Sequence, residues 1–179
     1  MTANIQDWAG DWPALHTDRA MTEEERDAAA RKILAGLSLE QKAGQLHGTI
    51  RFLQIMAMGW NYGVEPYLMC DSPGSGIPPL YFTDGPRGAT QHGSTCFPVS
   101  MARGATFDPA LEERVGDAIG VEARSHGSSF YAGVCINLLR HPGWGRAQET
   151  YSEDPYHMGE MGAALTRSTQ RHLMACVKH

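Results

Sequence analysis

The chain has 179 residues, of which 42% are hydrophobic and 20% charged, and its formal net charge is −5. This composition is typical of a folded globular protein and excludes an extended disordered chain. The acidic balance argues against a nucleic-acid or membrane partner, because either would require a basic face. The sequence contains no run of about 18 apolar residues and no secretory signal, so we expect a cytoplasmic protein without a membrane span.

Two capping boxes open the ordered part of the chain. Thr22 is followed three positions later by Glu25, and Ser38 by Gln41. In this pattern the hydroxyl accepts a backbone N–H, and the later side chain accepts one in return. We therefore predict a helix after each box, the second running to about Leu46. Residues 1–20 are expected to be an irregular lead-in, separate from a domain over 21–179.

The segment 48–78 is rich in Gly, Pro and Met and shows no periodicity. We predict an irregular connection here, with a helical turn around Arg51–Met58.

Strands and helices are expected to alternate in the remainder of the chain. Apolar runs predict buried strands over 80–83, 130–139 and 173–177, and the dipeptides Asp108-Pro109 and Asp154-Pro155 predict helix starts. Asp is a preferred N-cap, and Pro suits the first helical position. Met158, Met161 and Leu165 form the apolar face of the later helix. The alternation indicates an α/β fold in which helices cover a parallel sheet.

This order suggests part of a (β/α)8 TIM-type barrel. A complete barrel requires about 250 residues, whereas the chain offers three or four strands and stops one residue after an apolar strand. We therefore expect parallel strands with outer helices, truncated at about half a barrel, with a missing C-terminal part on the same polypeptide. A smaller open sheet is the alternative.

Polar residues gather where the predicted strands end. Asp84, Arg140 and Lys178-His179 follow three different strands, and Arg146 lies in the loop after the second of them. Functional residues of parallel α/β folds collect at this edge. Each residue also has a structural interpretation: a turn for Asp84, a structural arginine that pins nearby acidic residues, and an exposed strand end for Lys178-His179. Trp144 either stacks on a ligand or fills the loop core, and we favour the core.

Several kinds of chemistry are not indicated. The sequence has no nucleotide-binding glycine motif, no nucleophile elbow and no metal-binding histidine pair, so we expect no cofactor and no metal site. The four cysteines, at positions 70, 96, 135 and 176, lack metal or redox spacing. We interpret them mostly as buried apolar residues. Asp154 is explained as an N-cap, and neither Glu149 nor Glu153 is proposed as a hydrolytic acid.

The motifs resemble those of glycoside hydrolase family 3, the β-glucosidase and β-xylosidase family. The similarity covers about 37–179 and comprises an opening helix at 37–46, Leu80–Gly88, Phe97-Pro98 with Ala105–Pro109, Asn137–Pro155, and Ala175–His179. Ala147 and Gln148 depart from the common pattern, which leaves the subfamily open. A related branch that cleaves N-acetylglucosaminides also has a Lys-His motif, but Asp-Gly-Pro-Arg-Gly at 84–88 fits the glucosidase branch better.

The resemblance implies a barrel in which Asp84, Arg146, Lys178 and His179 bind hydroxyls of the sugar in the −1 subsite, with a less direct role for Arg140. It also implies a retaining hydrolase whose nucleophile and acid/base lie in regions absent from these 179 residues. We therefore expect a small carbohydrate substrate, terminal β-D-glucoside hydrolysis by the parent enzyme, and no turnover by this chain alone. A non-catalytic sugar-binding or structural fragment is the alternative.

Overall fold

The computed structural model describes residues 21–49, 56 and 63–179. They fall into two compact units, one holding 21–49 and 69–79 and the other holding 56, 63–68 and 80–179. The expected lead-in over 1–20 lies outside the described residues, as does the helical turn at Arg51–Met58 apart from Met56, which is helical. None of the helices in the described ranges is long and apolar enough to cross a membrane.

The first unit contains both helices predicted from capping boxes, α1 (Glu23–Gly36) and α2 (Leu39–Gly44). The Glu25 N–H donates to Thr22 Oγ1 at 3.2 Å, and the Thr22 N–H donates to Glu25 Oε2 at 2.8 Å. The same reciprocal pair joins Ser38 and Gln41. The prediction of both starts is confirmed, and α2 ends slightly earlier than expected.

The sheet has the strand order β1-β2-β3-β4, with β1 at Tyr67–Met69, β2 at Leu80–Asp84, β3 at Phe130–Cys135 and β4 at Met174–Lys178. β3 lies parallel to both β2 and β4. In the register Asp84 pairs with Ala132, and Cys135 pairs with Lys178. The carboxyl ends of these three strands therefore meet at one edge of the sheet.

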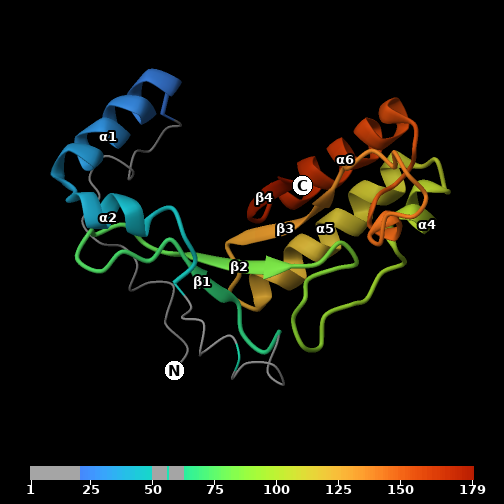
Figure 1. Ribbon diagram of the computed structural model, residues 1–179, viewed down its shortest axis with the longest axis horizontal. Coiled ribbons are helices and arrows are strands. Elements are labelled where there is room, and N and C mark those ends of the chain that lie inside the picture. The colour runs from blue at the N-terminus through green and yellow to red at the C-terminus, as the bar shows by residue number, and fades with distance from the viewer. Residues whose placement is uncertain (1–20, 50–55, 57–62) are drawn as a thin grey trace. The chain divides into compact units, whose positions relative to one another are not determined.

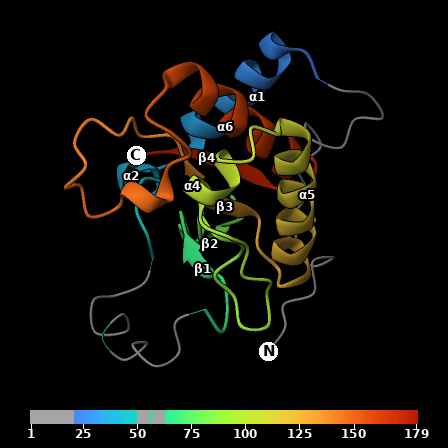
Figure 2. The same cartoon turned by 90° about the vertical axis from the view of Figure 1, so that its right-hand side faces the viewer.

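Two long helices lie beside each other along β3 and β4 (Figures 1 and 2). They are α5 (Pro109–Ser125) and α6 (Pro155–Thr169), and each begins at the predicted Asp-Pro pair. Asp108 Oδ1 accepts the Leu111 N–H at 3.0 Å, and Asp154 Oδ1 accepts the His157 N–H at 2.7 Å. Side chains of these helices and of β3 form the core: Ile119, Ala123, Tyr131, Val134, Met158, Met161 and Leu165 are all buried.

The structure corrects two strand predictions and adds two short elements. β3 ends at Cys135 and not at Leu139, because the apolar run continues into a loop whose Leu138 packs against the core. β4 is half exposed at Met174 and Val177, since it is the last strand in the order. The short elements β1 and α4 (Ser100–Gly104) were not predicted.

The cysteine interpretation holds only in part. All four cysteines are free, but only Cys135 is buried; Cys96 is exposed, and Cys70 and Cys176 are half-buried.

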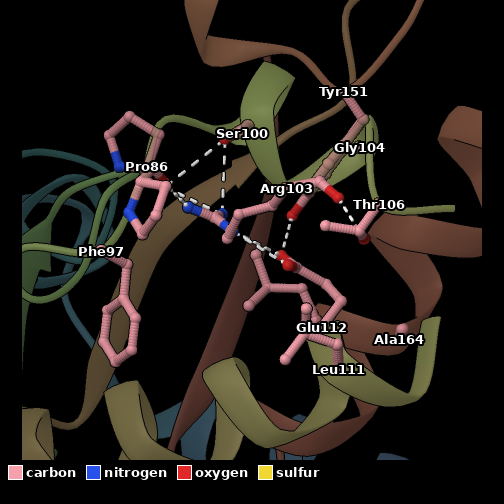
Figure 3. Close-up of polar contacts among 12 residues, drawn as sticks. Pro86, Phe97, Ser100, Arg103, Gly104, Thr106, Leu111, Glu112, Tyr151 and Ala164 are labelled. Carbon is pink, nitrogen blue, oxygen red and sulfur yellow. Dashed lines mark hydrogen bonds and ion pairs between the residues drawn. The ribbon is translucent and has the colours of Figure 1, made fainter. Parts of the chain in front are cut away.

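A buried ion pair connects the loops that follow β2 and β3 (Figure 3). Arg103 on α4 donates from Nε to Glu112 Oε2 on α5 at 2.9 Å, and both side chains are at most 4% exposed. The same guanidinium donates to the carbonyl of Pro86, and Tyr151 donates its hydroxyl to Glu112. The ion pair therefore holds both loops against the helix layer.

Candidate active site

Asp84 and Lys178 meet at the carboxyl edge of the sheet. They are the last residues of β2 and β4 and lie on either side of β3. Lys178 Nζ donates to Asp84 Oδ1 at 2.7 Å, with side chains 16% and 34% exposed. Oδ1 also accepts the Gly85 N–H at 2.9 Å. Among the described residues, no hydrogen bond to Asp84 Oδ2 is present, so this oxygen can accept one from a ligand.

The turn after Asp84 depends on a glycine. Gly85 has a φ of 123°, and a Cβ there would lie within 3.0 Å of both the Gly88 carbonyl oxygen and Thr90 Oγ1. Residues with a side chain rarely adopt this conformation. The Asp-Gly pair therefore fixes the carboxylate at the strand end, and the turn and functional interpretations of Asp84 are compatible.

Arg146 forms a two-bond pair with Glu149 in the loop after β3. Its Nε donates to Oε1 at 2.8 Å and its Nη2 to Oε2 at 2.5 Å. The hydrogen bonds from Arg146 hold the pKa of Glu149 below its usual range, against the opposing effect of burial. Arg146 therefore has the predicted structural role toward one of the acidic residues, Glu149. Because Arg146 is 46% exposed, its remaining donors can still reach a ligand.

His179 lies beside this pair. Its backbone N–H donates to Asn137 Oδ1 at 3.0 Å, and its ring Nδ1 is 2.8 Å from the same oxygen. Partial removal of the ring from solvent, followed by the charges of Arg146 and Lys178, lowers the pKa of His179. These effects favour the neutral form of the imidazole.

The structure thus brings four of the five predicted site residues together: Asp84 with Lys178 directly, and His179 with Arg146 through their charges. Arg140 is exposed, and its guanidinium has no hydrogen bond or ion pair with any described residue. Trp144 is half-buried. The sequence did not single out Asn137 or Cys135, because neither residue type signals a site at these spacings.

A family model for the glycosyl hydrolase family 3 N terminal domain matches residues 67–179, which include the whole candidate site. The chain belongs to glycosyl hydrolase family 3. The resemblance inferred from the motifs is therefore confirmed.

Relatives of this family 3 chain include a β-glucosidase from Rhizobium radiobacter, 40% identical over 112 residues, or 58% of this chain and 14% of that protein. β-Glucosidase B from Emericella nidulans is 32% identical over 159 residues, which are 85% of this chain and 17% of that protein. The chain thus spans less than a fifth of either relative's length.

Solved structures are similar as well. β-Glucosidase 3B from Thermotoga neapolitana, in complex with α-D-glucose, superposes with a TM-score of 0.69 and 29% identity over 83% of this chain and 22% of that one. A β-glucosidase from Streptomyces venezuelae, in complex with D-glucose, superposes with a TM-score of 0.70 and 27% identity. The match covers 84% of this chain and 18% of that one. These similarities support the mixed α/β fold with parallel strands that the sequence indicated.

The arginine–glutamate pair of the family 3 chain gives a pH prediction. A carboxylate with a lowered pKa stabilises the fold above its unfolded pKa, and this stability is lost as the pH falls through the folded value. We expect NMR titration to give Glu149 a pKa below that of an unperturbed glutamate, and Arg146→Met to raise this pKa. Arg167→Met, which removes an exposed cation paired with Glu113, should leave the Glu149 titration unchanged. An unaltered Glu149 pKa in Arg146→Met would contradict the pairing.

Proposed function

We propose that this chain supplies the sugar-binding part of a retaining β-glucosidase, within a barrel of which the described sheet is about half. The observation that carries the proposal is the convergence of Asp84, Lys178, His179 and Arg146 at the ends of three parallel strands. Substrates of parallel α/β enzymes bind at this edge. The relatives named β-glucosidase support the choice of a glucoside.

The site residues suit a neutral, hydroxyl-rich ligand. Asp84 Oδ2 is available to accept a hydrogen bond, and a charged acceptor binds a hydroxyl more strongly than a neutral one. Lys178 and Arg146 supply donors for hydroxyl oxygens. Because each is already paired with a carboxylate, the donors are held in place before the sugar arrives, which reduces the entropy lost on binding.

The hydrolytic step requires two further carboxyl groups. In the retaining mechanism one carboxylate attacks the anomeric carbon, while a carboxylic acid protonates the leaving oxygen and later activates water. Glu149 does not fit the acid role, since Arg146 lowers its pKa and that role needs a raised pKa. Asp84 suits sugar binding, because Lys178 and the Gly85 N–H hold its Oδ1 and its Oδ2 is open to a hydroxyl. Following the family resemblance, we assign both hydrolytic groups to polypeptide outside these 179 residues.

The substitution Asp84→Asn, made in the full-length polypeptide that contains this chain, tests the sugar-binding role of Asp84. Losing a charge-assisted hydrogen bond to the sugar costs about 1.5–3 kcal/mol. We expect kcat/KM for an aryl β-glucoside to fall roughly ten- to hundredfold. Glu160→Gln removes an exposed carboxylate on α6 and should leave kcat/KM unchanged. A folded Asp84→Asn enzyme with the parent kcat/KM would contradict the role of Asp84.

A binding measurement separates the two functional interpretations. Saturable glucose binding with no hydrolysis in that full-length polypeptide would favour a sugar-binding protein over an enzyme.

A further inference from the structure

Three side chains with metal-binding atoms meet beside the candidate sugar site. They are Cys135 at the end of β3, Glu149 in the short helix η3 (Ala147–Glu149), and His179 after β4, and one ligand atom from each lies within 4.8 Å of the other two. The Cys135 Sγ is 3.8 Å from Glu149 Oε2. The sequence did not indicate this cluster, because its members are 14 and 30 positions apart and only the parallel strands bring them together.

The spacing is close to that of a tetrahedral zinc site. Bond lengths of about 2.3 Å to sulfur and about 2.0 Å to oxygen or nitrogen place neighbouring ligand atoms roughly 3.5 Å apart. The sulfur–oxygen separation of 3.8 Å already approaches this value. A small movement of the His179 side chain, which is exposed, can shorten the remaining distances between ligand atoms.

Asn137 fixes the tautomer of His179 and leaves Nε2 as the ring nitrogen that can bind a metal. Its Oδ1 accepts the His179 backbone N–H, so this atom is an acceptor, and the ring Nδ1 facing the same oxygen must be a donor. The neutral ring therefore carries its lone pair on Nε2. A histidine that ligates a metal commonly donates its other N–H to an oxygen in this way.

The local charges are compatible with a bound cation. The two cations, Arg146 and Lys178, are each paired with a carboxylate. Glu149 Oε2 accepts from Arg146 and faces the Cys135 sulfur, so it can use its second lone pair for a metal. A thiol binds such an ion as the thiolate, so the Cys135 proton is released on binding.

We propose that Cys135, Glu149 and His179 form a binding site for a borderline-soft divalent cation such as Zn²⁺, with a fourth position open. Sulfur and imidazole ligands favour such an ion over Mg²⁺ or Ca²⁺. If the proposed function is correct, the ion occupies the sugar site and excludes glucose, which would make it an inhibitor. Cation binding itself does not depend on that function.

The test is a titration of the reduced, tag-free full-length polypeptide that contains this chain, with Zn²⁺ by calorimetry and with Cd²⁺ by ultraviolet absorption. We expect one ion per chain and a cadmium–thiolate charge-transfer band. Outer-sphere partners of ligating histidines contribute about 10–100-fold to affinity. Asn137→Ala should therefore weaken binding by that factor, and Cys135→Ser or His179→Gln by at least as much. His179 is exposed, so its substitution does not endanger the fold.

Cys96→Ala and Cys176→Ala are the matched controls, since they remove thiols outside the cluster. Both should retain the band and the affinity. A band that survives Cys135→Ser, an affinity unchanged in His179→Gln, or no binding by the parent chain would overturn the proposal. Glucose competition is measured separately: Zn²⁺ binding that glucose does not weaken would leave the cation site intact and count only against the shared sugar site.

Discussion

Glu112→Ala is expected to destabilise the protein by about 3–5 kcal/mol, since it leaves the buried Arg103 cation without its partner. Arg103 is 4% exposed and cannot turn to water without opening the contact between α4 and α5. The Tyr151 hydroxyl loses its acceptor in the same substitution. Urea unfolding followed by circular dichroism measures the effect as a lower midpoint.

The neighbouring residue provides the control. Glu113→Ala removes an ion pair with Arg167 whose side chains are 39% and 59% exposed, and such pairs contribute about 0–1 kcal/mol. Replacing Arg103 and Glu112 together with methionine should restore part of the loss, because no buried charge then remains unpaired, although the Tyr151 hydroxyl and the Pro86 carbonyl still lack these partners. Equal destabilisation by Glu112→Ala and Glu113→Ala would mean that the buried pair has no special role.

Gly133→Ala is expected to cost at least about 3 kcal/mol, at the upper end of the usual range for overpacking. A Cβ at this position in β3 would lie within 3.0 Å of the Tyr131 ring and of the Gly85 carbonyl oxygen. Tyr131 is fully buried, and its hydroxyl donates to Gly85 at 2.5 Å. The added methyl group therefore displaces the turn that holds Asp84, and the arrangement of the candidate site should be lost together with stability.

Gly159→Ala is the matched control on α6. A Cβ there meets nothing within 4 Å, and alanine stabilises a helix interior by about 0.5–1 kcal/mol relative to glycine. Thermal unfolding should therefore shift in opposite directions for the two variants. A Gly133→Ala protein as stable as the parent would show that β3 can move to accommodate the methyl group.

The long regular elements could be predicted because their signals are local. An N-cap hydrogen bond joins residues three positions apart, so Asp108 and Asp154 marked the starts of α5 and α6. The helical spacing of the apolar residues Met158, Met161 and Leu165 indicated one buried face. The predicted end of β3 was wrong because an apolar run indicates burial, and burial continues at Leu138 after strand pairing has stopped.

The proximity of the proposed site residues was predictable, but their pairings were not. Asp84, Lys178, His179 and Arg146 were expected near one another because parallel strands end at one edge, whereas the partner of each cation depends on distances that no local pattern contains. Glu149 was grouped with the acidic residues that follow it, and only the loop geometry separates it from them. Arg103 carried no sequence signal, because its burial depends on the turn after β2 and on Tyr151.

The two ion pairs at the strand ends also determine how a ligand reaches the site. Asp84 and Lys178 cancel each other's charge, as do Arg146 and Glu149, so the edge of the sheet exerts little electric field beyond contact range. The neutral sugar that we propose as the ligand would then be captured by short-range hydrogen bonding after a diffusional encounter, without long-range attraction. Salt screens charges over about 10 Å at 0.1 M, so it should have little effect on the rate of this encounter. The rate of sugar capture should thus be nearly the same in dilute and in concentrated electrolyte.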